Sequence, residues 1–415
     1  MAETLTFSKT QEVISKANLL LFSALLFIMP IYPKALPLII VLSLIVYLLD
    51  SFIVKDIKCS DKKIITIGVL FFIAHIISVF YSENRNLAWF DIEVKLSLFI
   101  FPLLFFIKNR TFINKNNLLM NSFVSGSLIA VFLMLYKGFD NYNSLGTESF
   151  RYTNISLFHP TYMAMYLNMS IVVLFNQLSI KNKNIKGALI LMICVFSFMI
   201  YLLESKAGII IYMITMTCMT WKVFLGQSQI KTKGISIFII LIIGGLIFYG
   251  SNRTQFMFKN VYKTVLTGEI VNEATTGDRL KVWNASIDII SKNILFGVGS
   301  GDVKEELMDC YKKHGYRYAI QKNLNSHSQY LETFIGQGLM GFTLLVVMFV
   351  FGFYKAYKRK EFILMYFLII VCLNFLFESM LNTMTGVIFF SVFYYLLMNF
   401  EVEQHQRIKH SYENN

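Results

Sequence analysis

Apolar residues in this chain gather into long runs, and polar residues are concentrated in the segments between them. A helix needs about 20 predominantly apolar residues to cross a bilayer. The runs predict about twelve spans, at 17–33, 36–54, 64–80, 94–107, 118–136, 161–178, 186–204, 206–224, 235–250, 329–354, 362–378 and 382–400. The fourth run is short, as in a tilted or partly interfacial segment. We therefore expect an all-α integral membrane protein in which residues 1–415 form a single polytopic domain.

One long polar segment, residues 251–328, separates the ninth and tenth runs. Part of it has apolar residues at the spacing of an amphipathic helix, namely Leu280, Trp283, Ile287 and Ile290. Three glycines then interrupt the chain between 297 and 301, and Asp302 with Glu305 has the pattern of a helix start. We expect this loop to carry short helices and to pack over the functional site, because function concentrates in loops held by a rigid scaffold.

The placement of positive charge predicts the orientation in the membrane. Lys and Arg gather in alternate loops, as in the loop that contains Lys55, Lys58, Lys62 and Lys63. Cytoplasmic loops carry such an excess. Both termini are then cytoplasmic, and residues 251–328 lie outside. The net charge of +13 needs no nucleic-acid partner, since most of it consists of these topology signals facing anionic lipid headgroups.

Ionisable residues inside the apolar runs are scarce. His75 is the clear case, and we interpret it as a hydrogen-bonded packing residue. Glu204, Lys206 and Glu378 lie at the predicted outer ends of their runs. Charge therefore collects at the outer membrane surface rather than along a path through the bilayer, which favours chemistry there over transport. No internal repeat typical of transporters is found.

The cysteines predict neither a disulfide nor a metal site. Their spacing matches no ligand pattern: one, Cys310, lies alone in the long polar segment, and the others are Cys59, Cys194, Cys218 and Cys372.

Two residues within the long polar segment suit the chemistry of a site: Arg279 suits phosphate binding, and His327 suits acid–base chemistry. Arg279 lies in the first turn of the predicted amphipathic helix, where free N–H groups favour an anion and a guanidinium adds a planar fork. Asn325 or Ser326 is expected to cap the tenth span, which places His327 in its first turn at the interface. A histidine there can accept a proton near neutral pH.

Several motifs, in order, resemble the domain shared by bacterial O-antigen ligases and O-antigen polymerases. The core of the resemblance is the run from Gly277 to Trp283 (GDRLKVW), then GVG at 297–299, HSQYLE at 327–332 and GQGLMG at 336–341. Shorter matches are YSEN at 81–84, HPTY at 159–162 and ESML at 378–381. The resemblance covers most of the chain.

The resemblance implies a glycosyltransferase that takes a glycan from undecaprenyl diphosphate and transfers it to an acceptor hydroxyl on the periplasmic side. Carried over, the catalytic base is His327 and the diphosphate-binding cation of the loop is Arg279. A further cation falls at Lys206, where many relatives have arginine, so the charge is kept and the bidentate geometry is lost. No metal or nucleotide cofactor is implied.

Four more residues are candidates for diphosphate or substrate binding: His159, Arg151, Arg85 and Glu378. Each has a simpler interpretation. His159 precedes a proline and can stiffen a turn, Arg85 and Arg151 can pair with loop carboxylates, and Glu378 can either buffer a cation or cap a helix end. Lys206 can also serve as a headgroup anchor.

Three classes of function stay open. A ligase moves a finished glycan onto lipid A–core, and we lean towards it because of the single compact motif that contains His327. A polymerase joins repeat units that remain on lipid carriers. A polysaccharide or lipid transporter is the third class. In the first two, the partners are a lipid-linked donor, a lipid A–core or growing-glycan acceptor, and the lipids of the bacterial inner membrane.

Overall fold

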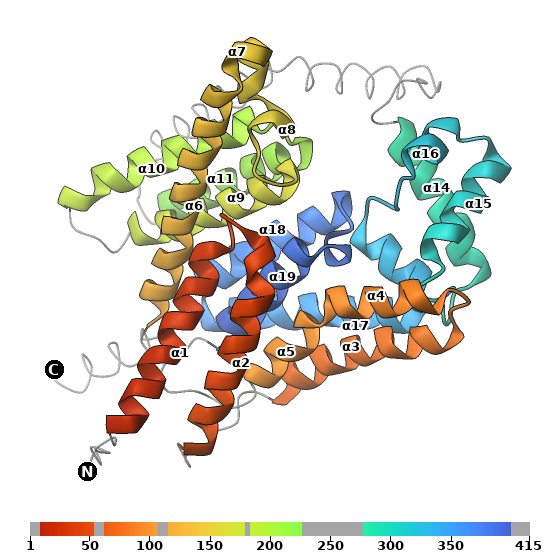
Figure 1. Ribbon diagram of the computed structural model, residues 1–415, viewed down its shortest axis with the longest axis horizontal. Coiled ribbons are helices and arrows are strands. Elements are labelled where there is room, and N and C mark those ends of the chain that lie inside the picture. The colour runs from red at the N-terminus through yellow and green to blue at the C-terminus, as the bar shows by residue number, and fades with distance from the viewer. Residues whose placement is uncertain (1–8, 54–61, 106–114, 179–182, 226–276, 400–415) are drawn as a thin grey trace.

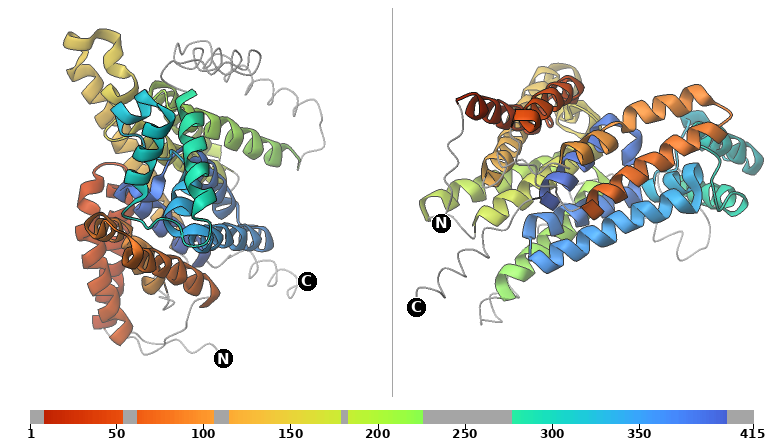
Figure 2. Two further views of the ribbon diagram at one scale, coloured as in Figure 1. Left: turned by 90° about the vertical axis from the view of Figure 1, so that its right-hand side faces the viewer. Right: turned by 90° about the horizontal axis from the view of Figure 1, so that it is seen from below.

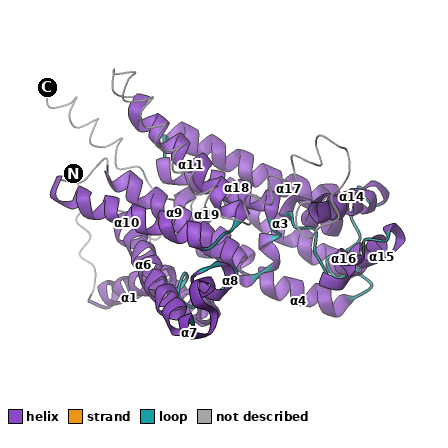
Figure 3. Ribbon diagram, turned by 90° about the horizontal axis from the view of Figure 1, so that it is seen from above, coloured by secondary structure: helices purple, strands orange, loops and turns teal. Residues whose placement is uncertain are grey.

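The computed structural model describes residues 9–53, 62–105, 115–178, 183–225 and 277–399 (Figure 1). All regular structure in these ranges is helical, with no strand among them (Figure 3). The predicted all-α fold is confirmed for this part of the chain. The ninth run, 235–250, and residues 251–276 of the long polar segment lie outside the described residues.

The other eleven predicted runs fall on described helices. In chain order these and the short helices between them are α1 (Lys9–Ile28), α2 (Leu36–Ile53), α3 (Lys62–Tyr81), α4 (Arg85–Lys95), α5 (Ser97–Leu104), α6 (Asn116–Asp140), α7 (Tyr142–Leu145), α8 (Tyr152–Ile155), α9 (Pro160–Leu178), α10 (Lys183–Leu202) and α11 (Lys206–Leu225). After the undescribed residues come α14 (Gly277–Lys292), α15 (Val303–His314), α16 (Arg317–Lys322), α17 (Gln329–Arg359), α18 (Phe362–Phe377), the 3-10 turn η4 (Met380–Asn382) and α19 (Met384–Asn399).

Four of these helices are long and apolar enough to cross a membrane, at Lys62–Tyr81, Asn116–Asp140, 184–202 and Gln329–Arg359. Several others are apolar but shorter, and the fourth run is represented by the eight-residue α5. The chain is therefore an integral membrane protein by its helices, and the number of twelve spans stays a prediction.

The core of the bundle lies where α9, α18 and α19 meet. In α9 every residue from Pro160 to Leu174 is buried, and α19 is buried from Gly386 to Met398. A helix that is apolar on all sides is either a membrane span or part of a protein core, and here other helices surround α9 and α19. Aromatic contacts cross between the helices: Tyr166 stacks on Phe389 at 4.9 Å between ring centroids.

The outer segment, as we call residues 277–328, forms a small helical unit at one end of α3, α4 and α17 (Figures 1 and 2). It has its own apolar centre, made by α14 residues such as Val282 and Ala285 and α15 residues such as Leu307 and Tyr311. Helix α15 ends at a left-handed Gly315. The outer segment is thus a folded unit rather than an irregular loop.

Asp302 fixes this unit to the membrane bundle. The sequence suggested that Asp302 starts α15 as part of a capping box. It does occupy the N-cap position, but its side chain makes no capping hydrogen bond. Its two carboxylate oxygens instead accept the backbone N–H groups of Glu83 and Asn84, each at 2.8 Å. A carboxylate that accepts two backbone N–H groups makes a strong, directional contact, so the turn between α3 and α4 is held against α15.

A second contact joins the two glycine motifs backbone to backbone. The N–H groups of Val298 and Gly299 donate to the carbonyl groups of Ile335 and Gly336, at 2.8 and 3.0 Å. Those carbonyl groups are accessible because α17 is interrupted at Gly338, which has a φ of +61°. This left-handed conformation is disfavoured for residues with a Cβ atom.

We predict that Gly338→Ala destabilises the protein. An added Cβ atom would lie 2.4 Å from the carbonyl oxygen of Leu295, in a backbone conformation that strains alanine. The expected loss in the free energy of unfolding is about 1–3 kcal/mol, measured by denaturant or thermal unfolding in detergent. The control is Gly187→Ala in α10, where an added Cβ atom meets nothing within 4 Å. Equal stability of the two variants would contradict this account of the kink.

Candidate active site

Glu378 is the centre of the candidate site. Its carboxylate lies 3.6 Å from Nη2 of Arg279 and 3.8 Å from Nδ1 of His327. The Thr161 hydroxyl donates to the same carboxylate at 3.4 Å. We call these four residues the Glu378 cluster. They were predicted from separate motifs, apart from Thr161, and the fold brings them together across more than 200 positions of sequence.

Helix ends position each member of the cluster. Arg279 is in the first turn of α14, Thr161 is in the first turn of α9, and His327 lies two residues before α17. Glu378 follows the last residue of α18 with an extended backbone. The N-terminal ends of three helices therefore meet around one carboxylate. Each such end presents free N–H groups and partial positive charge, which favour an anion.

Two further predicted cations lie along the same chain of contacts. Ser205 donates to the Thr161 hydroxyl at 3.2 Å and, through its Oγ, also accepts the N–H of Gly208 at 3.1 Å. Lys206 follows it directly as the first residue of α11. Glu204 precedes it and forms an ion pair with Arg151 at 3.4 Å. The 204–206 turn thus connects Arg151, through Glu204, and the start of α11 at Lys206, through Ser205, to Thr161 of the cluster, and it adds a fourth helix N-terminus.

His327 is held in a strained conformation. The sequence placed it in the first turn of the tenth span, capped by Asn325 or Ser326; this is wrong, because α17 begins at Gln329 with Ser328 at the N-cap position. His327 instead has a φ of +48°, and its N–H donates to the side-chain oxygen of Asn325 at 3.1 Å. Left-handed conformations of bulky residues cost energy and cluster at functional sites.

Glu332 ties the His327 segment to the Glu378 segment. The Ser326 hydroxyl donates to one Glu332 oxygen, and the Asn382 side-chain amide donates to the other at 2.7 Å. Ser326 also contacts the Ser379 hydroxyl at 3.2 Å. Residues next to His327 are thereby fixed to residues next to Glu378, so the separation between the two functional side chains is set by a polar network behind them.

The electrostatic environment keeps Glu378 ionised. Burial of the carboxyl group favours its neutral form, since only 13% of the side chain is exposed. Contact with His327 and the positive charges of Arg279 and His159 outweigh that effect and lower the pKa below its ordinary value. At 3.8 Å the His327 contact is longer than a hydrogen bond, and Nδ1 is buried without another hydrogen-bond partner. A small rotation of either side chain would bring Nδ1 of His327 within hydrogen-bond distance of the Glu378 carboxylate.

His159 and Arg85 differ in their relation to the cluster. His159 is exposed, directly precedes α9, and is close enough to Glu378 to influence its pKa. Arg85 is the exposed first residue of α4, beside the turn that Asp302 holds. Among the described residues no hydrogen bond or ion pair joins Arg85 to the cluster. The structure therefore brings four of the seven predicted residues together and connects Lys206 and Arg151 to them through the 204–206 turn, whereas Arg85 lacks such a connection within the described part of the chain.

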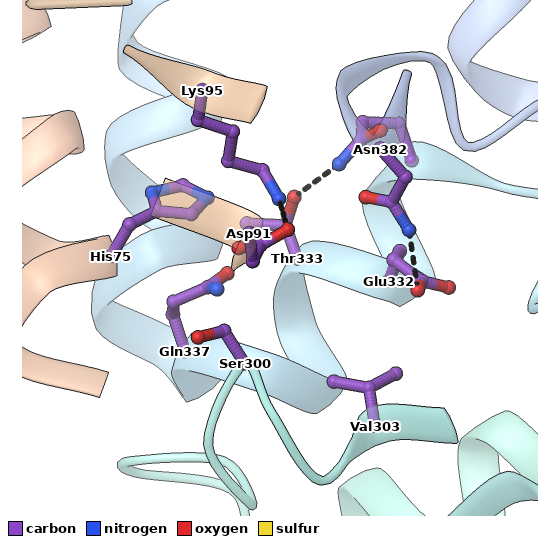
Figure 4. A pocket seen from close by; sticks show the side chains of 10 residues that line it. His75, Asp91, Lys95, Ser300, Val303, Glu332, Thr333, Gln337 and Asn382 are labelled. Carbon is purple, nitrogen blue, oxygen red and sulfur yellow. Dashed lines mark hydrogen bonds and ion pairs between the residues drawn. The ribbon is translucent and has the colours of Figure 1, made fainter. Parts of the chain in front are cut away.

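A small polar cavity of about 30 Å³ is lined in part by Glu332 (Figure 4). Lys95 points towards Asp91 there and forms an ion pair with it. None of the seven predicted site residues lines this cavity. It also contains His75, whose Nδ1 contacts the carbonyl group of Phe71 at 2.9 Å, as expected of a packing residue. Through Glu332, the cavity adjoins the network that positions His327.

Sequence reasoning missed the residues that support the site. Thr161 is two positions from the candidate His159, and Ser205 directly precedes the candidate Lys206. Single hydroxyl groups of this kind form no sequence pattern that would identify them. Glu332 was visible inside the HSQYLE motif, but its role depends on Asn382, which is 50 positions away. Contacts between helix ends of this kind cannot be read from local spacing.

Comparison with known families confirms the resemblance for part of the chain. Residues 187–346 match the family described as O-Antigen ligase. This segment contains Lys206, Arg279 and His327, and it is consistent with the O-antigen ligase superfamily, whose members are glycosyltransferase-like membrane enzymes. No curated protein matches the chain. Glu378, His159, Arg151 and Arg85 lie outside the matched range.

We predict that ionised Glu378 stabilises the protein near neutral pH. Because its pKa is lower in the folded protein than its ordinary value, this contribution is complete above the unfolded pKa and is lost as the pH falls through the folded value. Wild type should melt at a higher temperature than Glu378→Gln at pH 7, and the difference should shrink as the pH falls below the ordinary glutamate pKa of about 4.3. Glu306→Gln, an exposed carboxylate on α15, is the control. A difference that does not depend on pH would contradict the assignment.

Proposed function

We propose that this protein is an O-antigen ligase: it transfers a glycan from undecaprenyl diphosphate to a hydroxyl group of lipid A–core at the periplasmic face of the bacterial inner membrane. The observation that carries the proposal is the placement of Arg279 and His327 within 4 Å of one partly buried carboxylate, Glu378. A phosphate-binding group and a potential base thus share one site, and both lie in the segment that matches the family.

The donor's diphosphate is the group that the site would hold. Arg279 supplies a planar guanidinium fork, and Lys206 and Arg151 add charge nearby. The N-terminal ends of α9, α11, α14 and α17 supply further positive potential. Fixed positive charge of this kind stabilises the negative charge that grows on a departing diphosphate. A site at helix ends also suits a polyprenyl carrier, whose diphosphate sits at headgroup level while its tail stays in the bilayer.

His327 is the proposed general base. Its Nδ1 faces Glu378, so a proton on Nδ1 would point at the carboxylate and leave Nε2 free to accept a proton. The acceptor oxygen attacks the anomeric carbon, the bond from that carbon to the diphosphate oxygen breaks, and the acceptor's proton passes to Nε2. The diphosphate leaves on its lipid carrier with the bonding electron pair. The left-handed backbone of His327 fixes the direction from which the ring approaches.

Glu378 has two tasks in this proposal. Its negative charge orients His327 and stabilises the imidazolium that forms, as a carboxylate does in other base–carboxylate pairs. It also pairs with Arg279 before the donor arrives, which limits the cost of keeping a partly buried guanidinium. Binding of a diphosphate would supply Arg279 with a new anionic partner and leave the carboxylate to His327. Glu378 therefore links donor binding to the state of the base.

The acceptor distinguishes a ligase from a polymerase. Both use the same donor and the same proton transfer, so the Glu378 cluster would serve either. The compact outer segment leaves the ligase as our choice, with lipid A–core as acceptor and a polymerase acting on lipid-linked repeat units as the alternative outcome. Neither reaction as written routes a step through a metal or nucleotide.

We predict that His327→Ala and Arg279→Ala abolish long-chain surface glycan in a deletion strain at matched expression. Removal of a general base costs about 10²–10⁴-fold in rate, and loss of a charge-stabilising donor costs about 10²–10³-fold. The matched control is Arg317→Ala, an exposed arginine at the start of α16 in the same outer segment, which should complement fully.

The species that accumulates in the mutants identifies the reaction. Full-length chains on undecaprenyl diphosphate indicate a ligase, whereas single repeat units attached to the acceptor indicate a polymerase. Full complementation by both His327→Ala and Arg279→Ala would contradict the site.

We also predict that the charge at Lys206 matters more than its shape. Lys206→Arg restores the residue found in many relatives and should retain at least wild-type activity. Lys206→Ala should lower activity roughly tenfold or more, because it removes a cation beside the departing diphosphate. Transfer rates of the purified variants provide the test. If Lys206→Ala is as active as wild type, Lys206 is an anchor at the membrane surface and not part of the site.

A further inference from the structure

Three side chains that the proposed reaction does not use meet between α14 and α15. Asp288 comes from α14, and Cys310 and His314 come from α15. One potential ligand atom from each residue lies within 4.8 Å of the other two. Nε2 of His314 is 2.9 Å from Oδ2 of Asp288. These contacts place sulfur, nitrogen and oxygen donors around a single point.

The arrangement follows from the helices. Cys310 and His314 are four residues apart on α15 and therefore lie on the same face. Leu307 and Tyr311 pack that helix against α14, where Ala285 and Ile289 are their partners in the same apolar centre. Asp288 lies between Ala285 and Ile289 in the sequence of α14, and its side chain reaches towards α15. The three side chains are held by two packed helices rather than by a loose loop.

We propose that Asp288, Cys310 and His314 form a binding site for Zn²⁺ or a similar borderline transition-metal ion. Thiolate, imidazole and carboxylate groups are the ligands that Zn²⁺ uses in proteins. Mg²⁺ and Ca²⁺ prefer sets made of oxygen alone, so the sulfur and nitrogen donors select against them. Zn²⁺ deprotonates a coordinating thiol, and the proton is released to solvent. Three protein ligands leave the fourth tetrahedral position for water.

Each ligand differs in its exposure, and together they allow a metal to enter. Cys310 is buried, whereas His314 is exposed and Asp288 is partly buried. The imidazole of His314 stacks on Tyr316 with ring centroids 5.3 Å apart, which limits its rotation. A metal ion could therefore arrive from solvent through His314 and be fixed by the buried sulfur. The bound ion would join α15 to α14, the helix whose first turn carries Arg279.

This inference does not depend on the proposed glycosyl transfer. The test uses the full-length protein purified in detergent, stripped with a chelator and titrated with Zn²⁺ and then with Co²⁺. We expect one tightly bound Zn²⁺ per chain, and with Co²⁺ a thiolate-to-metal charge-transfer band together with the visible bands of a four-coordinate site. Cys310→Ala should abolish the charge-transfer band. Asp288→Asn and His314→Gln should each weaken Zn²⁺ binding roughly tenfold or more.

Controls separate the site from adventitious binding. Cys194→Ala, which changes an exposed cysteine on α10, should leave both the stoichiometry and the charge-transfer band unchanged. Thermal unfolding of each metal-free variant establishes that it is folded, and Zn²⁺ should raise the melting temperature of wild type but not that of Cys310→Ala. Wild-type protein without a charge-transfer band, or Cys310→Ala that binds Zn²⁺ as tightly as wild type, would overturn the proposal and leave Asp288 and His314 as a simple ion pair.

Discussion

A single, largely enclosed carboxylate organises the candidate site. Glu378 is 13% exposed, and an isolated charge in such a place would be expensive, so its ionised form depends on the guanidinium of Arg279 and on the imidazole of His327. The dependence is mutual, because the carboxylate also fixes the direction of both partners. Helix ends far apart in the sequence must therefore meet at this point, and the polar network around Glu332 keeps them there.

The outer segment can contribute Arg279 only because it is attached to the membrane bundle at defined places. Asp302 binds the turn between α3 and α4, and the glycine turn at 297–301 binds the interrupted part of α17. The first attachment joins a side-chain carboxylate to two backbone N–H groups, and the second joins backbone to backbone. The position of α14 is therefore set by these hydrogen bonds as well as by its apolar contacts. A site shared between the outer segment and the membrane bundle requires that the two be positioned precisely relative to each other.

Much of the fold was predictable, because long apolar runs in the sequence indicate membrane helices. The helices of the outer segment have apolar residues at helical spacing and glycines near their ends. The residues that meet at Glu378, apart from Thr161, were predicted from motif order and from Arg279 and His327 as residue types. The geometry was not. His327 lies outside α17 because Asn325 and Glu332 hold the preceding turn, and Asp302 binds a distant backbone rather than its own helix. Polar side-chain contacts decided both cases: they are local for His327 and join distant parts of the chain for Asp302.

The most direct test of the account is transfer by purified protein from a lipid-diphosphate-linked glycan to a lipid A–core acceptor, with donor binding measured separately. We expect wild type to release one lipid diphosphate for each glycan transferred. His327→Ala should bind the donor with unchanged affinity and transfer about 10²–10⁴-fold more slowly. Transfer by His327→Ala at the wild-type rate would show that the base lies elsewhere and would contradict the central role given to the pairing of His327 with Glu378.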